Sequence, residues 1–263
     1  MLDVEQQQYA KLGSEYFWFA GKRHLAWSLL NRYLDGGDRL NILDVGCGPG
    51  YSFSELKQWG SIVGIDTSQE ALGVCRNRNG HEASLICGSA EALPCRDQTF
   101  SLVVALDVFE HLEDDVAGLR ECQRVLRVGG WLLVSVPAFP WLWGDHDDLY
   151  RHKRRYRVTE LQAKLESAGF ERVKITYCKS FFVGLLWMFR RLKQLSFASR
   201  RDDFLQPPAW LNRWLTWLIT SEAPLIHRWN LPWGAEIIGI ARKPCEFSSL
   251  PSRTSPESFQ DNP

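Results

Sequence analysis

The sequence lacks an excess of charge of either sign, because its 263 residues include 31 Lys and Arg and 31 Asp and Glu. Binding to nucleic acid by general electrostatic attraction requires such an excess, so nucleic acid is disfavoured as a partner. Long apolar runs are also missing. The longest of them, residues 181–189, is too short to cross a bilayer as a helix.

Cysteine pairs at metal-binding or redox spacing are absent too. None of the seven cysteines belongs to a C-x-x-C pair, and the spacing of Cys and His residues matches no zinc site. Scattered, unpaired cysteines are typical of proteins in a reducing compartment. Residues 1–13 are polar and acidic and lack the apolar region of a secretory signal. We therefore predict a cytoplasmic protein without a bound metal.

What the sequence does have is a regular alternation of strand and helix patterns. Short apolar runs predict strands at residues 40–45, 61–65, 83–87, 100–106, 131–136, 173–177 and 235–241. Helical spacing predicts helices at residues 16–34, 54–59, 68–78, 114–126 and 159–168, with Ser68 and Thr159 as N-caps and with Gly129 and Gly130 closing the fourth. The alternation predicts an α/β fold with a doubly wound, seven-stranded, mostly parallel sheet and helices on both faces. Ligands of such folds bind at the carboxyl ends of the strands.

The chain divides into three predicted parts. Residues 1–39 form an N-terminal helical cap, residues 40–245 a ligand-binding domain, and residues 246–263 a disordered tail rich in Ser and Pro. Within the domain, an aromatic-rich helical insertion over residues 179–234 precedes the last strand.

A glycine-rich segment, Asp44-Val-Gly-Cys-Gly-Pro-Gly50, directly follows the first predicted strand. Glycines at such a turn let the backbone approach a ligand closely. A dinucleotide site of the type G-x-G-x-x-G would need its third glycine where Tyr51 stands. Asp44 would also repel a pyrophosphate, whereas it suits a ligand that carries a sulfonium and an ammonium group. The segment therefore predicts S-adenosylmethionine (SAM) as the cofactor.

The second predicted strand ends at Asp66. A carboxylate there can accept hydrogen bonds from both ribose hydroxyls of an adenosine group. The alternative is that it caps the helix that begins at Thr67 and Ser68. The strand end, the spacing and the glycine loop together favour the ribose role.

Over residues 40–178 the sequence resembles the Rossmann-like (class I) SAM-dependent methyltransferase family. LDVGCGPG resembles the first motif of that family, GID the second, CGSAEALP the third, FSLVVALDVFEHL the fourth and LRVGGWLLVSVP the fifth-strand region. The resemblance implies that the glycines line SAM and that Asp66 holds its ribose. It also implies that Ala90 lies beside the adenine and that Leu106 and Asp107 lie near the methionine half.

One position departs from the family pattern. Many relatives have an Asp where Ser89 stands, and that Asp contacts the adenine amino group, whereas Ser89 can offer a hydroxyl oxygen. The predicted cofactor-binding residues are Asp44, Gly46, Cys47, Gly48, Gly50, Asp66, Thr67, Ser89, Ala90, Glu91, Leu106 and Asp107.

Methyl transfer to a hydroxyl or a neutral amine needs a group that takes the proton. The candidates are His111, His146 and His152, with Asp107, Glu110, Asp145, Asp147 and Asp148 as residues that could orient them. His111 follows the fourth strand at the ligand-binding end of the sheet, but a Glu-His pair there can equally serve the start of a helix. A metal held by residues 146, 147 and 152 would lack a diagnostic spacing.

Residues 137–156 leave the carboxyl end of the fifth strand, where a substrate loop is expected. The loop is aromatic at first and becomes basic from Arg151 onward. Similar loops and aromatic N-terminal helices occur in a bacterial subgroup related to quinone-, lipid- and glycan-pathway methyltransferases. The predicted acceptor-binding residues are Tyr16, Trp18, Arg23, Trp143, Arg151, Arg154 and Arg155. The alternative is that the charges of the loop pair with one another on a solvated face.

The insertion places Trp210, Trp214 and Trp217 on one face of a predicted helix. This face could pack in the core, form a lid over the site or contact another subunit. Residues 179–221 could also lie in a membrane interface, where Trp is favoured together with Arg and Lys, and the protein would then be membrane-associated.

The sequence thus predicts an enzyme that transfers a methyl group from SAM to an oxygen, or less favourably a nitrogen or carbon, of a small or lipid-like and potentially anionic acceptor. Two alternatives stay open. One is a protein that binds SAM or a partner enzyme without catalysis, and the other is an NAD(P)-dependent Rossmann enzyme, although the Tyr-x-x-x-Lys pair of that class is absent.

Overall fold

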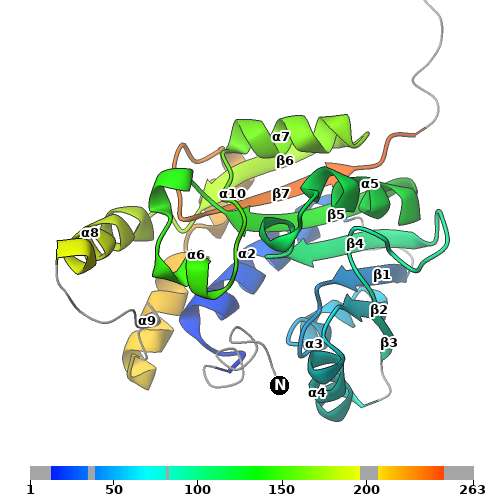
Figure 1. The fold of residues 1–263 in the computed structure, drawn as a ribbon, viewed down its shortest axis with the longest axis horizontal. Coiled ribbons are helices and arrows are strands. Elements are labelled where there is room, and N and C mark those ends of the chain that lie inside the picture. Colours follow the sequence, from blue (N-terminus) through cyan, green and yellow to red (C-terminus); the bar gives the residue numbers. More distant parts are fainter. Residues whose placement is uncertain (1–12, 35–38, 81–82, 196–206, 246–263) are drawn as a thin grey trace, which may run out of the picture.

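The computed structural model describes residues 13–34, 39–80, 83–195 and 207–245, and their seven strands form one sheet in the order β3-β2-β1-β4-β5-β7-β6 (Figure 1). The strands are β1 (Leu40–Val45), β2 (Gly60–Asp66), β3 (Ala83–Cys87), β4 (Phe100–Leu106), β5 (Leu126–Pro137), β6 (Glu171–Cys178) and β7 (Glu236–Arg242). The first five pair in parallel, whereas β7 runs antiparallel to both β5 and β6. The predicted doubly wound, mostly parallel sheet is confirmed.

Helices cover both faces of this sheet (Figure 1). One face packs against α5 (Asp115–Val125) and α7 (Val158–Ser167). The other packs against α2 (Phe17–Tyr33), α3 (Phe53–Leu56), α4 (Gln69–Asn79), α9 (Ala209–Thr220) and α10 (Ala223–Arg228). The remaining helical segments are η1 (Phe109–His111), η2 (Pro140–Leu142), α6 (Asp145–Leu149) and α8 (Phe182–Leu195).

The central strands are apolar on both faces because both faces are covered. Ile42 of β1 belongs to the core beneath α2, and its neighbour Leu43 belongs to the core beneath α5. Leu102 and Val103 of β4 alternate in the same way. Such strands read as continuous apolar runs in the sequence, which is why their positions were predictable.

Two local predictions were wrong. Gly129 and Gly130 do not close α5, because that helix ends at Val125 and β5 begins at the next residue. The backbone groups of both glycines pair with Lys243 beyond β7, a partner that local sequence does not reveal. The N-cap of α7 is Arg157 rather than Thr159, although Ser68 caps α4 as predicted through a 3.2 Å hydrogen bond from Ala71 N.

The insertion contributes α8, α9 and α10. Helix α9 packs against α2, where Asn212 Oδ1 accepts a hydrogen bond from Phe17 N at 2.9 Å. Its other face carries Trp210, Trp214 and Trp217, which are 70%, 51% and 63% exposed. Of the alternatives considered for this tryptophan face, packing in the core of the chain is therefore wrong.

Within the part of the chain that the structure covers, no helix combines the length and apolar character needed to span a membrane. The predicted disordered tail, residues 246–263, lies outside the described residues, as do residues 1–12 of the predicted N-terminal cap.

Candidate functional site

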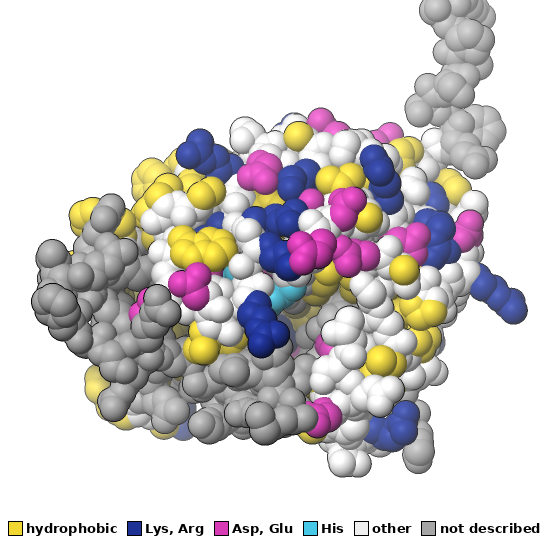
Figure 2. Space-filling model, in the orientation of Figure 1, with side chains coloured by type: hydrophobic (Ala, Val, Ile, Leu, Met, Phe, Trp, Pro, Cys, Tyr) yellow, Lys and Arg dark blue, Asp and Glu magenta, His cyan; other side chains and the backbone are white. Residues whose placement is uncertain are grey.

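A cavity of about 320 Å³ opens at the carboxyl ends of β1, β2 and β4, where a ligand of this fold is expected. Helix α2 closes one side of it through Phe19, Lys22 and Arg23. Ten of the predicted cofactor-binding residues line it: Asp44, Gly46, Cys47, Gly48, Asp66, Thr67, Ser89, Ala90, Leu106 and Asp107. Figure 2 shows a hollow near the centre of one molecular face, with histidine side chains in it.

The glycine turn has two different tasks. Gly46 and Gly48 line the cavity with φ angles of +69° and +50°, which favour glycine. A Cβ on Gly46 would also lie 2.6 Å from Val108 Cγ2. Gly50 does not line the cavity, and a Cβ there would lie 2.4 Å from Cys75 Sγ of α4. Two glycines therefore shape the cavity, and the third lets α4 pack closely.

Asp44 is buried beneath this turn, with 4% of its surface exposed. Its Oδ2 has no hydrogen-bond partner among the described residues. Burial, followed by the neighbouring charges of Cys75 and Asp66, raises the pKa of Asp44 well above its usual value. A cationic ligand group in the cavity would stabilise this carboxylate, whereas a pyrophosphate would be repelled by it.

Asp66 holds the glycine turn in place. Its Oδ2 accepts a 2.8 Å hydrogen bond from Gly48 N, and its Oδ1 accepts one of equal length from Ser68 N. Burial raises the pKa of Asp66, although these backbone hydrogen bonds oppose the shift. Each oxygen keeps a further lone pair, so the contact with Ser68 leaves acceptor sites for two ligand hydroxyls.

Glu91 lies apart from the cavity lining. Its Oε1 accepts a 2.8 Å hydrogen bond from Asp114 N, the N-cap residue of α5. This contact ties the segment after β3 to the start of α5.

Four largely buried charges join α2 to the carboxyl ends of β4 and β6 and to the start of β7. Lys22 pairs with Asp107 and, at 2.6 Å, with Glu236. Lys179 also pairs with Glu236, and its Nζ lies 3.9 Å from the centroid of the Trp18 ring. Burial alone would raise the pKa of Glu236, but the two lysines outweigh it and hold that pKa below its usual value. Lys22, Lys179 and Glu236 were not predictable from the sequence, because no local motif links them.

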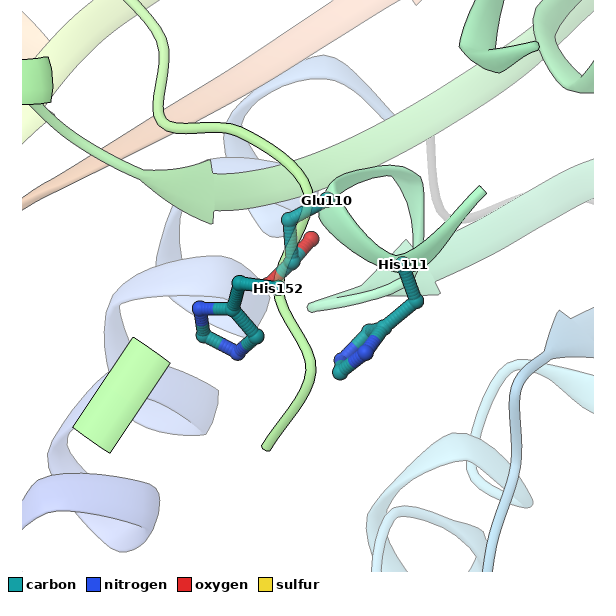
Figure 3. A group of neighbouring side chains, drawn as sticks. All are labelled: Glu110, His111 and His152. Carbon is teal, nitrogen blue, oxygen red and sulfur yellow. The ribbon is translucent and has the colours of Figure 1, made fainter. Parts of the chain in front are cut away.

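A group of titratable side chains lies beside the cavity, where η1 meets the loop after α6. The ligand-type atoms of Glu110, His111 and His152 all lie within 4.8 Å of one another (Figure 3). The rings of His111 and His152 meet edge to face with centroids 4.8 Å apart, and His146 lies 5.5 Å from His152 by the same measure. Of the three predicted catalytic histidines, His111 lines the cavity.

His152 is held from its outer side by Asp147. The Nδ1 of His152 lies 2.9 Å from Asp147 Oδ1, which also accepts a 2.7 Å hydrogen bond from Arg155 Nε. Burial would raise the pKa of Asp147, but the His152 hydrogen bond and the Arg155 charge hold it below its usual value. Because the carboxylate can only accept, Nδ1 carries the proton of a neutral His152 and its Nε2 keeps a lone pair.

The basic end of the loop pairs within the chain, but Arg155 does so in a buried contact rather than on the solvated face considered as an alternative. Arg155 is buried in the contact just described, and Arg154 pairs with Asp115 at 3.1 Å. Trp143 donates to an aspartate of the same loop, whereas Arg151 is exposed. These contacts hold the loop together and fix it on the start of α5.

The predicted acceptor-binding residues near the N-terminus lie in α2 and just before it. Arg23 lines the cavity and pairs with Glu55 at 3.0 Å. Tyr16 is buried, and Trp18 packs edge to face on Phe182 with centroids 5.6 Å apart. Arg23 therefore joins the cavity wall to α3, and Trp18 joins α2 to α8.

Comparison with known proteins finds a family that matches the part of the chain that contains the first five strands. Residues 43–134 match the family described as a methyltransferase domain. A probable SAM-dependent methyltransferase of Mycolicibacterium smegmatis is 32% identical over 164 residues, 61% of this chain and 62% of the relative. A ubiquinone biosynthesis O-methyltransferase of Parvibaculum lavamentivorans is 31% identical over 100 residues, 36% of this chain and 40% of the relative. The chain spans less than two thirds of the length of both relatives.

The solved structure of a SAM-dependent methyltransferase from Thermotoga maritima shares the fold. Its TM-score is 0.58 at 18% identity, over 90% of this chain and 95% of that chain. Together with the buried Asp44 and with Tyr51 in place of a third glycine, the comparisons argue against the NAD(P) alternative.

The buried charges around Glu236 give a stability prediction. Glu236→Gln leaves Lys22 and Lys179 with too little compensating charge, so we expect the free energy of unfolding to fall by about 3–5 kcal/mol. Urea titration followed by circular dichroism measures this. Glu113→Gln is the control, because Glu113 pairs with Lys153 at the surface and its loss should leave the unfolding midpoint unchanged. Equal midpoints for both variants would contradict the role of this network.

Proposed function

Because the chain belongs to the class I SAM-dependent methyltransferase family and its cofactor is SAM, we propose that it transfers a methyl group to an oxygen of a small or lipid-like acceptor. One arrangement carries the proposal, because three side chains line the same cavity. They are the buried carboxylate of Asp44, the carboxylate of Asp66 with acceptor sites for ribose hydroxyls, and the imidazole of His111. The first two suit the cofactor, and the third suits an acceptor that loses a proton.

The residues around the cavity fit SAM along its length. Asp44 offers its buried oxygen to the ammonium group, and the turn of Gly46 and Gly48 lets the cofactor lie against the backbone. Asp66 accepts hydrogen bonds from the ribose hydroxyls, and Ala90 lies at the adenine end. The bound cofactor supplies a methyl group activated by a positively charged sulfur.

The chain contributes position and proton handling. As the acceptor oxygen forms its bond to the methyl carbon, the carbon–sulfur bond breaks and its electron pair stays on the sulfur. The acceptor hydroxyl must lose its proton in this step, and the pair of His111 and His152 lies where it can assist. An amine would need such assistance before the attack only when protonated, because a neutral amine attacks with its lone pair. A Parvibaculum relative named as an O-methyltransferase supports the choice of oxygen.

A lipid-like acceptor is supported by the exposed apolar surface of the insertion. Trp210, Trp214 and Trp217 share the outer face of α9, and Arg213 on the same helix is also exposed. Exposed apolar patches of this kind mark contact surfaces, and Trp with Arg suits the interface of a membrane. We propose that α9 rests on a membrane surface and brings the cavity to an amphipathic acceptor.

The role of Asp44 predicts how SAM affinity changes with charge and pH. Asp44→Asn keeps the size of the side chain but removes its charge, so we expect the Kd for SAM to rise about 10- to 100-fold. In the unaltered protein affinity should fall as the pH drops through the raised pKa of Asp44, because the protonated carboxyl no longer attracts an ammonium. Isothermal titration at several pH values measures both effects. Asp97→Asn, at an exposed position, is the control, and unchanged affinity in Asp44→Asn would refute the assignment.

The role of the histidine pair predicts a loss of turnover with SAM binding retained. Turnover is measured as the formation of S-adenosylhomocysteine with each acceptor of a panel of quinols, phenols, lipid alcohols and amines. His111→Ala should lower turnover of a hydroxyl acceptor about 100- to 10,000-fold, whereas His24→Ala, at an exposed position of α2, should not. SAM binding without turnover on any acceptor would favour the non-catalytic alternative. Turnover of amines alone would contradict oxygen as the acceptor atom.

The membrane contact predicts binding to lipid vesicles. The unaltered protein should sediment with vesicles of mixed phosphatidylcholine and phosphatidylglycerol. The variant in which Trp210, Trp214 and Trp217 are replaced by Ser should stay in the supernatant. Trp141→Ser is the control, since Trp141 is exposed outside the insertion. No sedimentation of the unaltered protein, with a dimer seen by analytical ultracentrifugation, would assign the surface to a second copy instead.

A further inference from the structure

We propose that Glu110, His111 and His152 bind one divalent transition-metal ion, with Zn²⁺ as the best match, at the edge of the cofactor cavity. The three ligand-type atoms lie within 4.8 Å of one another, and they come from η1 and from a loop about forty residues further along the chain (Figure 3). This set is not visible as a spacing in the sequence, which is why no metal was predicted.

The donor set is chemically selective. One carboxylate oxygen and two imidazole nitrogens form the ligand set of catalytic zinc and of related transition-metal sites, which keep further positions open. In a tetrahedral site with metal–ligand bonds of about 2.0–2.2 Å, two ligand atoms of one ion lie about 3.3–3.6 Å apart. Closing this group around an ion therefore needs the ligand atoms to approach one another by at most about 1.5 Å, which side-chain rotation can supply.

The outer shell of the group is built as metal sites require. Asp147 accepts the Nδ1 hydrogen of His152 and is itself held by Arg155 and by a 2.8 Å hydrogen bond from Gly144 N. A carboxylate behind a histidine fixes the ring and leaves Nε2 free to bind a cation. An acceptor-binding role for Arg155 would not explain why it is buried against Asp147.

The backbone fixes the two halves of the group against each other. Lys153 N donates a 2.7 Å hydrogen bond to the carbonyl oxygen of Glu110, so His152 is held directly beside η1. The Tyr156 hydroxyl donates to Asp115 at 2.7 Å, which anchors the end of the loop on α5. A loop that merely paired its charges in solvent would not need these contacts.

The position of the ion would refine the proposed reaction, on which this part of the inference rests. Since His111 lines the cofactor cavity, an acceptor hydroxyl could occupy an open position of the ion beside the transferable methyl group. Coordination lowers the pKa of a bound hydroxyl, so its proton leaves to water before the oxygen attacks the methyl carbon. The histidines would then assist the loss of the proton through the cation that they hold, and not by accepting the proton themselves. An acceptor with two adjacent oxygens, as in a catechol, suits such an ion best.

The test is a titration of the chelator-treated, full-length protein with Co²⁺. Cobalt reports its ligands through its visible absorption, which separates nitrogen and oxygen donors from the thiolates of the cysteines. We expect one equivalent to bind without a thiolate charge-transfer band, and Zn²⁺ to displace it. Binding only with a thiolate band, or no binding at all, would overturn the proposal.

Variants locate the ion. His152→Ala and Glu110→Gln should each weaken Co²⁺ binding at least tenfold, and His24→Ala should not. If the buried Glu110→Gln variant fails to fold, His111→Ala replaces it. Asp147→Asn should weaken binding about 10- to 100-fold through the orientation of His152, and Asp148→Asn is its matched control. Equal Co²⁺ affinity in His152→Ala and the unaltered protein would refute the site.

SAM titration of the same samples separates this inference from the proposed function. SAM binding with no Co²⁺ binding would refute the metal site alone. Co²⁺ binding without any methyl transfer would leave the metal site in place and refute the proposed reaction.

Discussion

The pairing of two lysines with two carboxylates at the carboxyl ends of the strands is the constraint on which the site depends. Lys22 and Lys179 cannot be buried as cations without Asp107 and Glu236, and these residues come from four separate segments. The network therefore sets the position of α2 over the sheet. Because α2 forms one wall of the cavity, the shape of the cofactor site follows from it.

The sequence predicted the sheet and the cofactor half of the site because both rest on local patterns. Residues 40–45 and 100–106 are recognisable as buried strands since both of their faces are covered. Asp44, Gly46, Gly48 and Asp66 lie at strand ends of the sheet, so the order of the strands alone brings them together.

What the sequence could not give are contacts between distant segments. Gly129 and Gly130 continue β5 because their backbone groups form hydrogen bonds with Lys243. The residues around the two glycines do not indicate this partner, which lies more than a hundred residues further along the chain. Likewise, the basic run from Arg151 to Arg155 did not reveal that Arg154 anchors the loop on Leu112 and Asp115. The grouping of His152 with Glu110 depends on this anchoring.

The contact between α2 and α9 gives the exposed tryptophan surface a mechanical connection to the cavity. Asn212 of α9 holds the first turn of α2, and Ile219 packs against Gly21 one residue before Lys22. Helix α9 cannot move away without breaking this joint, and α2 cannot tilt without displacing a wall of the cofactor site. Binding of a partner or a surface to the tryptophans of α9 is thus transmitted through α2 to the wall of the cavity.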